Sequence, residues 1–95
     1  KWMVLEVLKI NRTKQFLKDF SKIDMSDQHY SKFIVYLSSL IKKETLPPEA
    51  LDHSLNGEYI GFREFHVSGD LLVIYKITED TLYLTRIGSH SQLFK

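Results

Sequence analysis

The sequence predicts an α+β fold in which an antiparallel sheet carries a two-helix hairpin on one face. The 95 residues are 43% hydrophobic and 13% aromatic, which is enough to build one compact core. Two stretches of the first half have apolar residues at helical spacing, and three strand-like runs follow closely in the second half. We therefore expect a single domain over residues 1–95 with the element order β-α-α-β-β-β and a short C-terminal helical turn.

The first strand is predicted from Met3 to Ile10, where apolar residues are almost continuous. It is expected in the middle of the sheet or at a protected edge. Met3 is also a candidate for the natural start of the chain, and Lys1 and Trp2 would then not be native.

The first helix is expected to begin after Asn11 or Thr13, because Phe16, Leu17 and Phe20 then share one apolar face. A separate stripe on this helix is basic and has the spacing i, i+4, i+8; it consists of Lys14, Lys18 and Lys22.

The second helix is expected to be capped by Ser26 or Asp27 and to end before Pro47 and Pro48. The residues predicted for its apolar face are Tyr30, Phe33, Ile34, Leu37, Leu40 and Ile41. Two consecutive amphipathic helices with a short joint indicate a hairpin laid on the sheet.

A loop is predicted from Leu46 to Gly61, and three strands are predicted at Phe62–Val67, Leu71–Ile77 and Thr81–Ile87. The connections between these strands are short enough to permit only antiparallel hairpins. The run Leu71–Ile77 is apolar at both odd and even positions, which is typical of a central strand covered on both faces.

The C-terminal turn is predicted by Ser89 and Gln92, which have the spacing of a capping box. On such a turn His90 and Phe94 stand four residues apart and share one face.

The composition excludes several classes of protein. There is no cysteine, which excludes disulfides and cysteine-ligated zinc, and no apolar run is long enough to span a membrane. We therefore expect a cytoplasmic domain without a membrane partner. The net charge is only +1, but the part up to Asp24 carries +3 and the remainder −2. This basic part is either a patch for a polyanion or acidic protein, or a solvated face.

The candidate catalytic residues are three histidines, an aspartate and an arginine: His53, His66, Asp70, His90 and Arg86. Imidazoles serve as general acids and bases near neutral pH. Arg86, and likewise Arg63, would stabilise the negative charge that develops on a phosphorane. Together these groups provide what the attack of an RNA 2′-hydroxyl on its own phosphate requires.

Hairpin geometry predicts that four of these residues gather at one end of the sheet. The start of Leu71–Ile77 and the end of Thr81–Ile87 lie at the same end of their hairpin. His66, Asp70, Arg86 and His90 should therefore meet there, whereas this argument does not place His53.

Each residue also has a structural interpretation. His53 is compatible with a surface or hydrogen-bonded role, Asp70 with a turn residue, and Arg63, which stands beside Glu64, with a residue that pairs across strands. Phe94 would either seal the core or stack on a base. The histidines and Asp70 are also compatible with a metal site, although no tight local pair such as His-x-x-x-His occurs.

Taken together, three segments resemble the RelE/ParE superfamily of bacterial type II toxins, specifically its YafQ-like branch of ribosome-dependent messenger RNA endonucleases. They are Asp52-His53-x-Leu55-x-Gly57, Phe62-Arg63-Glu64-x-His66-x-x-x-Asp70, and Arg86-x-Gly88-Ser89-His90-Ser91-x-Leu93-Phe94. The apolar strand ending in Val73-Ile74-Tyr75 lies between the last two.

The resemblance implies a RelE-like, microbial-ribonuclease-like fold and a cytoplasmic toxin that cuts mRNA in the ribosomal A site without a metal or cofactor. It implies an acid–base set of His53, His66, Asp70 and His90, a phosphate-stabilising Arg86, and Phe94 near the scissile base. Leu71 stands where some members have tryptophan.

The partners that the resemblance implies are a cognate antitoxin that silences the toxin, mRNA and the ribosome. Operator DNA would be contacted only through the antitoxin complex. The Lys14, Lys18 and Lys22 stripe is, as a hypothesis, a contact to ribosomal RNA. The alternative function is a non-nucleolytic toxin-fold module that binds a protein target, as relatives that poison gyrase do.

Overall fold

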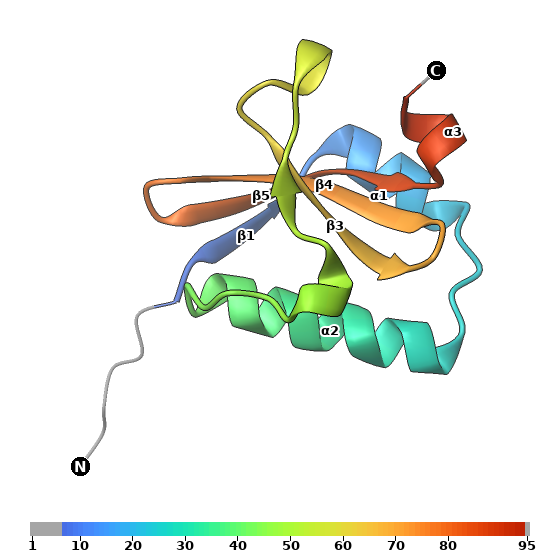
Figure 1. The fold of residues 1–95 in the computed structure, drawn as a ribbon, viewed down its shortest axis with the longest axis horizontal. Coiled ribbons are helices and arrows are strands. Elements are labelled where there is room, and N and C mark those ends of the chain that lie inside the picture. Colours follow the sequence, from blue (N-terminus) through green and yellow to red (C-terminus); the bar gives the residue numbers. More distant parts are fainter. Residues whose placement is uncertain (1–6, 95) are drawn as a thin grey trace.

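The computed structural model describes residues 7–94, which form one five-stranded sheet with α2 and α3 on opposite faces (Figure 1). The strands are β1 (Lys9–Arg12), β2 (His53–Ser54), β3 (Arg63–Ser68), β4 (Leu71–Thr78) and β5 (Thr81–Gly88). The helices are α1 (Lys14–Ser21), α2 (Asp27–Ile41) and α3 (His90–Leu93), with 3₁₀ turns η1 (Pro48–Ala50) and η2 (Gly57–Tyr59).

The strand order is β1-β5-β4-β3-β2, so β4 is the central strand, as its apolar pattern predicts. The pairs among β2, β3, β4 and β5 are antiparallel, but β1 pairs with β5 in parallel. The prediction of a wholly antiparallel sheet is therefore wrong at one edge. Most of the chain separates β1 from β5, and so long a connection imposes no antiparallel pairing.

The first strand also differs in extent from the prediction. Of the range Met3–Ile10, residues up to 6 lie outside the described residues, and β1 runs from Lys9 to Arg12. Thr13 caps α1 by accepting a hydrogen bond from the backbone N–H of Phe16 at 3.1 Å, which explains why the helix begins there rather than after Asn11.

The second helix is capped by Ser26, whose hydroxyl accepts from the backbone N–H of His29 at 3.1 Å. Its end at Ile41 precedes Pro47 by several residues, so the prolines do not stop it. Lys43 has a φ of 63°, and this left-handed residue turns the chain away from the helix.

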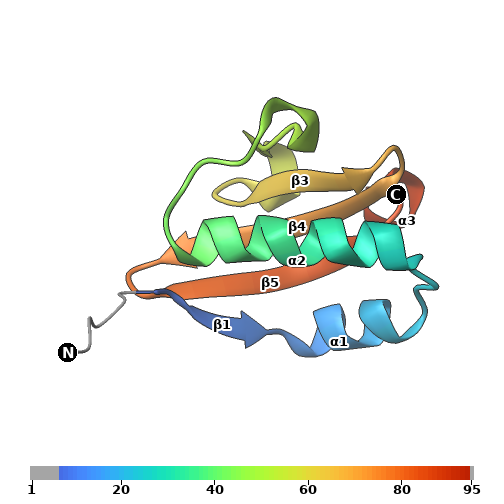
Figure 2. The ribbon, with the colours of Figure 1, turned by 90° about the horizontal axis from the view of Figure 1, so that it is seen from below.

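The core lies mainly between the sheet and the first two helices, and in Figure 2 α2 lies in front of the sheet. It is built from the inward-facing residues of the strands and from aromatic residues of both helices, among them Phe16, Phe33, Tyr36, Phe65 and Tyr75. Both predicted helices thus contribute to one core.

The predicted apolar faces of the helices are only partly buried. Leu17, Tyr30 and Ile34 remain 44–46% exposed and line a groove between α1, α2 and the sheet. Tyr36, which the helical pattern did not single out, is instead buried.

The predicted loop from Leu46 to Gly61 is more ordered than expected. It contains two 3₁₀ turns and the two-residue strand β2, which pairs with β3. None of the helices in residues 7–94 has both the length and the apolar character needed to cross a membrane.

Candidate active site

The candidate site lies on the face of the sheet opposite to α2, which we call the α3 face. Side chains alternate along strands, so burial of Phe65 and Val67 in the main core directs Glu64 and His66 of β3 to the opposite side. There Leu72 and Ile74 of β4 form a second small core with Leu93 of α3. The α3 face is therefore an apolar floor bordered by polar side chains.

One side of the site is a cluster of His53, Glu64 and His66, which we call the histidine–glutamate cluster. The pairing of β2 with β3 sets His53 directly opposite Glu64. The Nε2 atoms of His53 and His66 lie 3.3 and 3.2 Å from the same carboxylate oxygen, Oε2 of Glu64. The two rings are 6.4 Å apart between centroids. One carboxylate thus positions two imidazoles.

Glu64 is the unusual member of this cluster, because it is only 4% exposed. Its second oxygen, Oε1, is buried and has no hydrogen-bond partner among the described residues. A buried carboxylate is costly unless cations or donors compensate it, and within residues 7–94 only imidazole groups lie at hydrogen-bond or ion-pair distance from it. Interaction with the histidines is therefore what makes burial of this charge tolerable.

The backbone beside His53 is held by Asp52. Oδ1 of Asp52 accepts hydrogen bonds from the hydroxyl of Tyr75 at 2.7 Å and from Nε of Arg63 at 3.1 Å. Burial raises the pKa of Tyr75, and its hydrogen bond to Asp52 raises it further. Nδ1 of His53 lies 2.6 Å from the carbonyl oxygen of Leu51.

Arg63 therefore lies apart from Arg86. Arg63 stands opposite Tyr75 in the sheet. Burial alone would lower the pKa of Arg63, but hydrogen bonding to Tyr75 and the charge of Asp52 outweigh this effect, and the pKa is raised. The structural interpretation of Arg63 as a residue that pairs across strands fits the structure, since its partner is Asp52, the residue before β2, while the carboxylate of Glu64 faces the histidines.

The other side of the site is formed by Asp70, His90 and Phe94, which we call the C-terminal cluster. The backbone N–H of His90 donates to Oδ1 of Asp70 at 3.2 Å. The rings of His90 and Phe94 lie 4.8 Å apart between centroids, as their spacing on one helical turn predicts. Asp70 thus joins the turn before β4 to the start of α3.

The short helix α3 is fixed by the predicted capping box. The hydroxyl of Ser89 accepts from the backbone N–H of Gln92 at 3.3 Å, and the side chain of Gln92 accepts from the backbone N–H of Ser89 at 2.8 Å. Gly88 permits the close packing, because a Cβ there would lie 2.9 Å from Oε1 of Gln92. These contacts orient His90.

Arg86 reaches the α3 face through a β-bulge. Ile74 pairs with Arg86 and Tyr75 pairs with Leu84, which leaves Thr85 as the extra residue. Leu84 and Ile87 both pack in the main core although they are three positions apart, because the bulge adds one residue between them. Arg86, next to Ile87, therefore points to the opposite face, the α3 face.

The guanidinium of Arg86 is clamped by Asp19 of α1. Its Nε donates to Oδ2 of Asp19 at 2.7 Å and its Nη2 donates to Oδ1 at 3.2 Å, while Nη1 lies 3.4 Å from the hydroxyl of Tyr59. The hydrogen bonds to Asp19 raise the pKa of Arg86. Burial opposes ionisation of Asp19, but hydrogen bonds from Arg86, Gln15 and the backbone of Ile87 leave its pKa below the usual value.

The predicted residues gather at one end of the sheet. His66 pairs with Leu72, and Leu72 pairs with Gly88, two residues before His90. Arg86 lies one step further along, opposite Ile74. His53, which hairpin geometry did not place, joins through β2. Within residues 7–94 no hydrogen bond or ion pair joins the two clusters, which border the floor formed by Leu72 and Ile74.

Two residues of this site were missed by sequence reasoning. Glu64 had a usable signal, because strand alternation places it beside His66 once Phe65 and Val67 are assigned to the core. Asp19 had none, since it lies between the lysines of α1 and meets Arg86 only in the folded chain.

Of the basic stripe, Lys14 and Lys18 are exposed on α1. Lys22 lines a hollow of about 250 Å³ together with Asp19, Arg86 and Gln92. One of the three lysines thus extends the positive charge of the site toward α1.

The described residues contain no group of three or more His, Asp or Glu side chains placed to hold a metal ion. In the histidine–glutamate cluster, Nε2 of His66 instead hydrogen-bonds Oε2 of Glu64, and Nε2 of His53 lies at ion-pair distance, 3.3 Å, from the same oxygen.

Comparison with known proteins supports this architecture. An Escherichia coli protein named mRNA interferase toxin YafQ is 36% identical over 87 residues, covering 90% of this chain and 94% of the relative. The crystal structure of YafQ from E. coli has a TM-score of 0.82 at 30% identity and covers 93% of this chain and 99% of its own. The crystal structure of a copper-bound mutant toxin from Helicobacter pylori has a TM-score of 0.80 at 41% identity, and the match covers 92% of this chain and 99% of that toxin chain.

The family model described as bacterial toxin of type II toxin–antitoxin system, YafQ, matches residues 8–95. This match spans nearly the whole chain and includes both clusters of the candidate site. The chain therefore belongs to the YafQ family of bacterial type II toxin–antitoxin toxins.

Proposed function

We propose that this toxin is an endoribonuclease that cleaves mRNA in the ribosomal A site by acid–base catalysis. The observation that carries the proposal is the gathering of His53, His66, His90 and Arg86 on one face of the sheet. The name mRNA interferase, which the E. coli relatives bear, supports the same activity.

In this reaction the 2′-oxygen of a ribose forms a bond to the adjacent phosphorus, and the bond from phosphorus to the 5′-oxygen breaks. A base takes the proton of the 2′-hydroxyl and an acid gives a proton to the leaving 5′-oxygen. His66 and His90 share these two transfers, and Arg86 stabilises the charge on the phosphorane. The base and acid roles are assigned to these two histidines together, not to either one.

The other residues position this machinery. Glu64 orients His53 and His66, and Asp70 holds the start of α3 so that His90 and Phe94 face the substrate. Phe94 offers its ring to the base beside the scissile phosphate. Lys14, Lys18 and Lys22 contact ribosomal RNA on the α1 side, and no resident metal is needed for these steps.

The proposed partners follow from the same assignment. A crystal structure of the E. coli DinJ–YafQ complex, with 31% identity and a TM-score of 0.79, shows a relative bound to DinJ. We expect a cognate antitoxin to silence this toxin in the cytoplasm, and operator DNA to be reached only through that complex. The apolar groove between α1 and α2 offers exposed side chains for such a partner.

The test is primer extension on mRNA from a translating lysate with the wild-type chain and with His90→Ala. The expected result is A-site cuts for wild type and their loss for His90→Ala, with antitoxin binding retained. His29→Ala on α2 is the matched control, since this histidine lies outside the site. Full cleavage by His90→Ala removes this residue from the mechanism.

Two further arms separate the alternatives. Absence of A-site cuts with wild type, while growth still arrests, would favour a non-nucleolytic binding module with a protein target. Cleavage that persists with a chelator selective for transition metals, with the Mg²⁺ that ribosomes need left in place, supports metal-free chemistry, whereas its loss and its recovery with an added transition metal would contradict it.

A further inference from the structure

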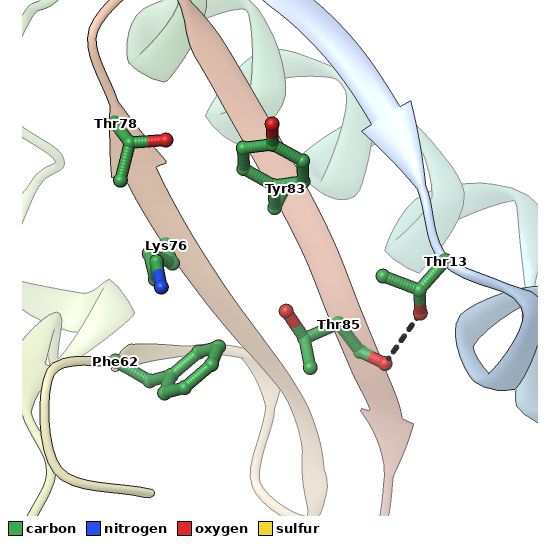
Figure 3. A pocket seen from close by; sticks show the side chains of 6 residues that line it. All are labelled: Thr13, Phe62, Lys76, Thr78, Tyr83 and Thr85. Carbon is green, nitrogen blue, oxygen red and sulfur yellow. Dashed lines mark hydrogen bonds between the residues drawn. The ribbon is translucent and has the colours of Figure 1, made fainter.

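A second hollow on the α3 face lies further along β4 and β5 and is not used by the mechanism above. It has a volume of about 310 Å³ and is lined by Thr13, Phe62, Lys76, Thr78, Tyr83 and Thr85. Figure 3 shows Phe62 and Lys76 along one side of this β4–β5 pocket and Tyr83 and Thr85 along the other.

The lining has the chemistry of a nucleotide site. Nζ of Lys76 lies 5.0 Å from the centre of the Phe62 ring, so a cation and an aromatic face are presented together. Tyr83 adds a second half-buried aromatic ring. No acidic side chain is among the residues that line the pocket. An aromatic wall with one cation suits a base and its phosphate.

Hydroxyl groups complete the pocket on the β5 side. Oγ1 of Thr13 donates to the carbonyl oxygen of Thr85 at 3.0 Å, which ties the start of α1 to β5 (Figure 3). The hydroxyl of Thr85 lies on the same β5 side, and Thr78 of β4 adds a hydroxyl across the pocket, on the strand of Lys76 (Figure 3). Threonine hydroxyls both donate and accept, so they match the edges of a base or ribose.

The pocket adjoins the candidate site. Thr85 immediately precedes Arg86 in the bulge, and Lys76 is two residues along β4 from Ile74, the partner of Arg86. The ring of Tyr59 meets Phe62 edge-on at 6.0 Å, and its hydroxyl lies 3.4 Å from Nη1 of Arg86. An RNA strand held at Arg86 therefore runs onto this pocket along the same face.

We propose that the β4–β5 pocket binds one mRNA nucleotide that flanks the scissile phosphate. The base packs against Phe62 or Tyr83, and Lys76 contacts a phosphate of the same strand. This subsite rests on the proposed endoribonuclease function and adds a position to it. The volume, near the lower limit for ligand pockets of about 300 Å³, suits one nucleotide and excludes a duplex.

The test measures binding of the full chain to a short single-stranded RNA by fluorescence anisotropy, with a 2′-deoxynucleotide at the cleavage position to block the reaction. Lys76→Ala and Tyr83→Leu should each bind about 5- to 30-fold more weakly, the effect of losing one stacked or charge-contacted base. Lys42→Ala, an exposed lysine at the end of α2, is the matched control and should bind like wild type.

Truncation of the RNA makes the test specific. One nucleotide is removed from the 5′ side in one ligand and from the 3′ side in another. For the ligand that lacks the pocket's nucleotide, wild type and Lys76→Ala should bind equally. If Lys76→Ala loses the same factor of affinity with all three RNAs, the proposal is overturned. It is also overturned if Lys76→Ala and Tyr83→Leu both bind the full-length RNA as tightly as wild type. Circular dichroism shows whether each variant is folded.

The origin of the nucleotide is tested with vacant ribosomes. Sedimentation with ribosomes that lack mRNA should be unchanged by Lys76→Ala, and a marked loss would assign the pocket to ribosomal RNA and overturn the proposal. Failure of the two proposals is distinguishable. Length-dependent binding without any wild-type cleavage contradicts only the enzyme assignment, and cleavage without length dependence contradicts only the pocket.

Discussion

The two sides of the candidate site are built in different ways. The histidine–glutamate cluster sits on paired strands around a carboxylate that is 4% exposed. The C-terminal cluster sits on a four-residue helix and is held by a capping box and by Asp70, with His90 exposed. The first is fixed by buried charge and the second by local hydrogen bonds. Substitutions should therefore act on chemistry and stability in different proportions on the two sides.

The largest effect is expected from Glu64→Gln, which removes the charge shared by His53 and His66. Cleavage should fall by about 100-fold, because proton transfer by positioned side chains contributes about that much or more. A changed pH–rate profile would distinguish this positioning role from a loss of folding. Glu44→Gln, at an exposed position after α2, is the control. Wild-type cleavage by Glu64→Gln would show that the carboxylate is not needed.

The second-largest effect on cleavage is expected from Asp19→Asn, which breaks the hydrogen bonds that hold Arg86. The side chains of the pair are only 24% and 11% exposed, so the unfolding free energy should fall by about 2 kcal/mol. Cleavage should fall by about tenfold because Arg86 is no longer oriented. Exposed Asp24→Asn is the matched control for both measurements.

The Asp19–Arg86 pair also predicts that the free energy of unfolding depends on pH. The pKa of Asp19 is lowered in the folded chain, so the unfolded chain binds its proton more readily. The stabilisation by ionised Asp19 is fully present above the ordinary pKa of a carboxyl group. It is lost as the pH falls through the lowered pKa that Asp19 has in the folded chain. Urea unfolding should show the largest gap between wild type and Asp19→Asn above about pH 5, narrowing on acidification. A constant gap would assign the stabilisation to other contacts.

A third, smaller effect is expected from Ser89→Ala, which removes the cap of α3. Loss of a helix cap costs about 1 kcal/mol, and here it frays the helix that carries His90. Cleavage should fall a few-fold while the unfolding midpoint moves little. Ser26→Ala removes the corresponding cap of α2 and should do the reverse, lowering stability and sparing cleavage. Equal behaviour of the two variants would contradict local control of the C-terminal cluster.

The predictability of the site from sequence follows the same division. The capping box, the pairing of His90 with Phe94 and the central position of β4 depend on short-range spacing, and the structure confirms them. The family assignment from three ordered segments is confirmed as well.

Long-range features were not encoded in such spacing. The parallel β1–β5 pair and the Asp19–Arg86 clamp join residues 67 or more positions apart, and the β2–β3 pairing of His53 depends on a two-residue strand. No periodicity predicts these contacts, because tertiary packing decides them. Strand alternation could have placed Glu64 beside His66, but a glutamate is not expected at a buried position.

The smallest effect is expected from Tyr59→Phe, and the sharpest comparison is with Tyr75→Phe, which also removes one hydroxyl. The hydroxyl of Tyr59 lies 3.4 Å from Nη1 of Arg86 on a half-buried surface, whereas that of Tyr75 donates to Asp52 at 2.7 Å and Tyr75 is 1% exposed. Tyr59→Phe should change the unfolding free energy by a few tenths of a kcal/mol and cleavage by about twofold at most. Tyr75→Phe should cost about 1.5 kcal/mol, because it leaves the partly buried carboxylate of Asp52 short of a donor. Chemical denaturation and cleavage of both variants measure this difference. Equal costs would mean that the two sides are equally rigid.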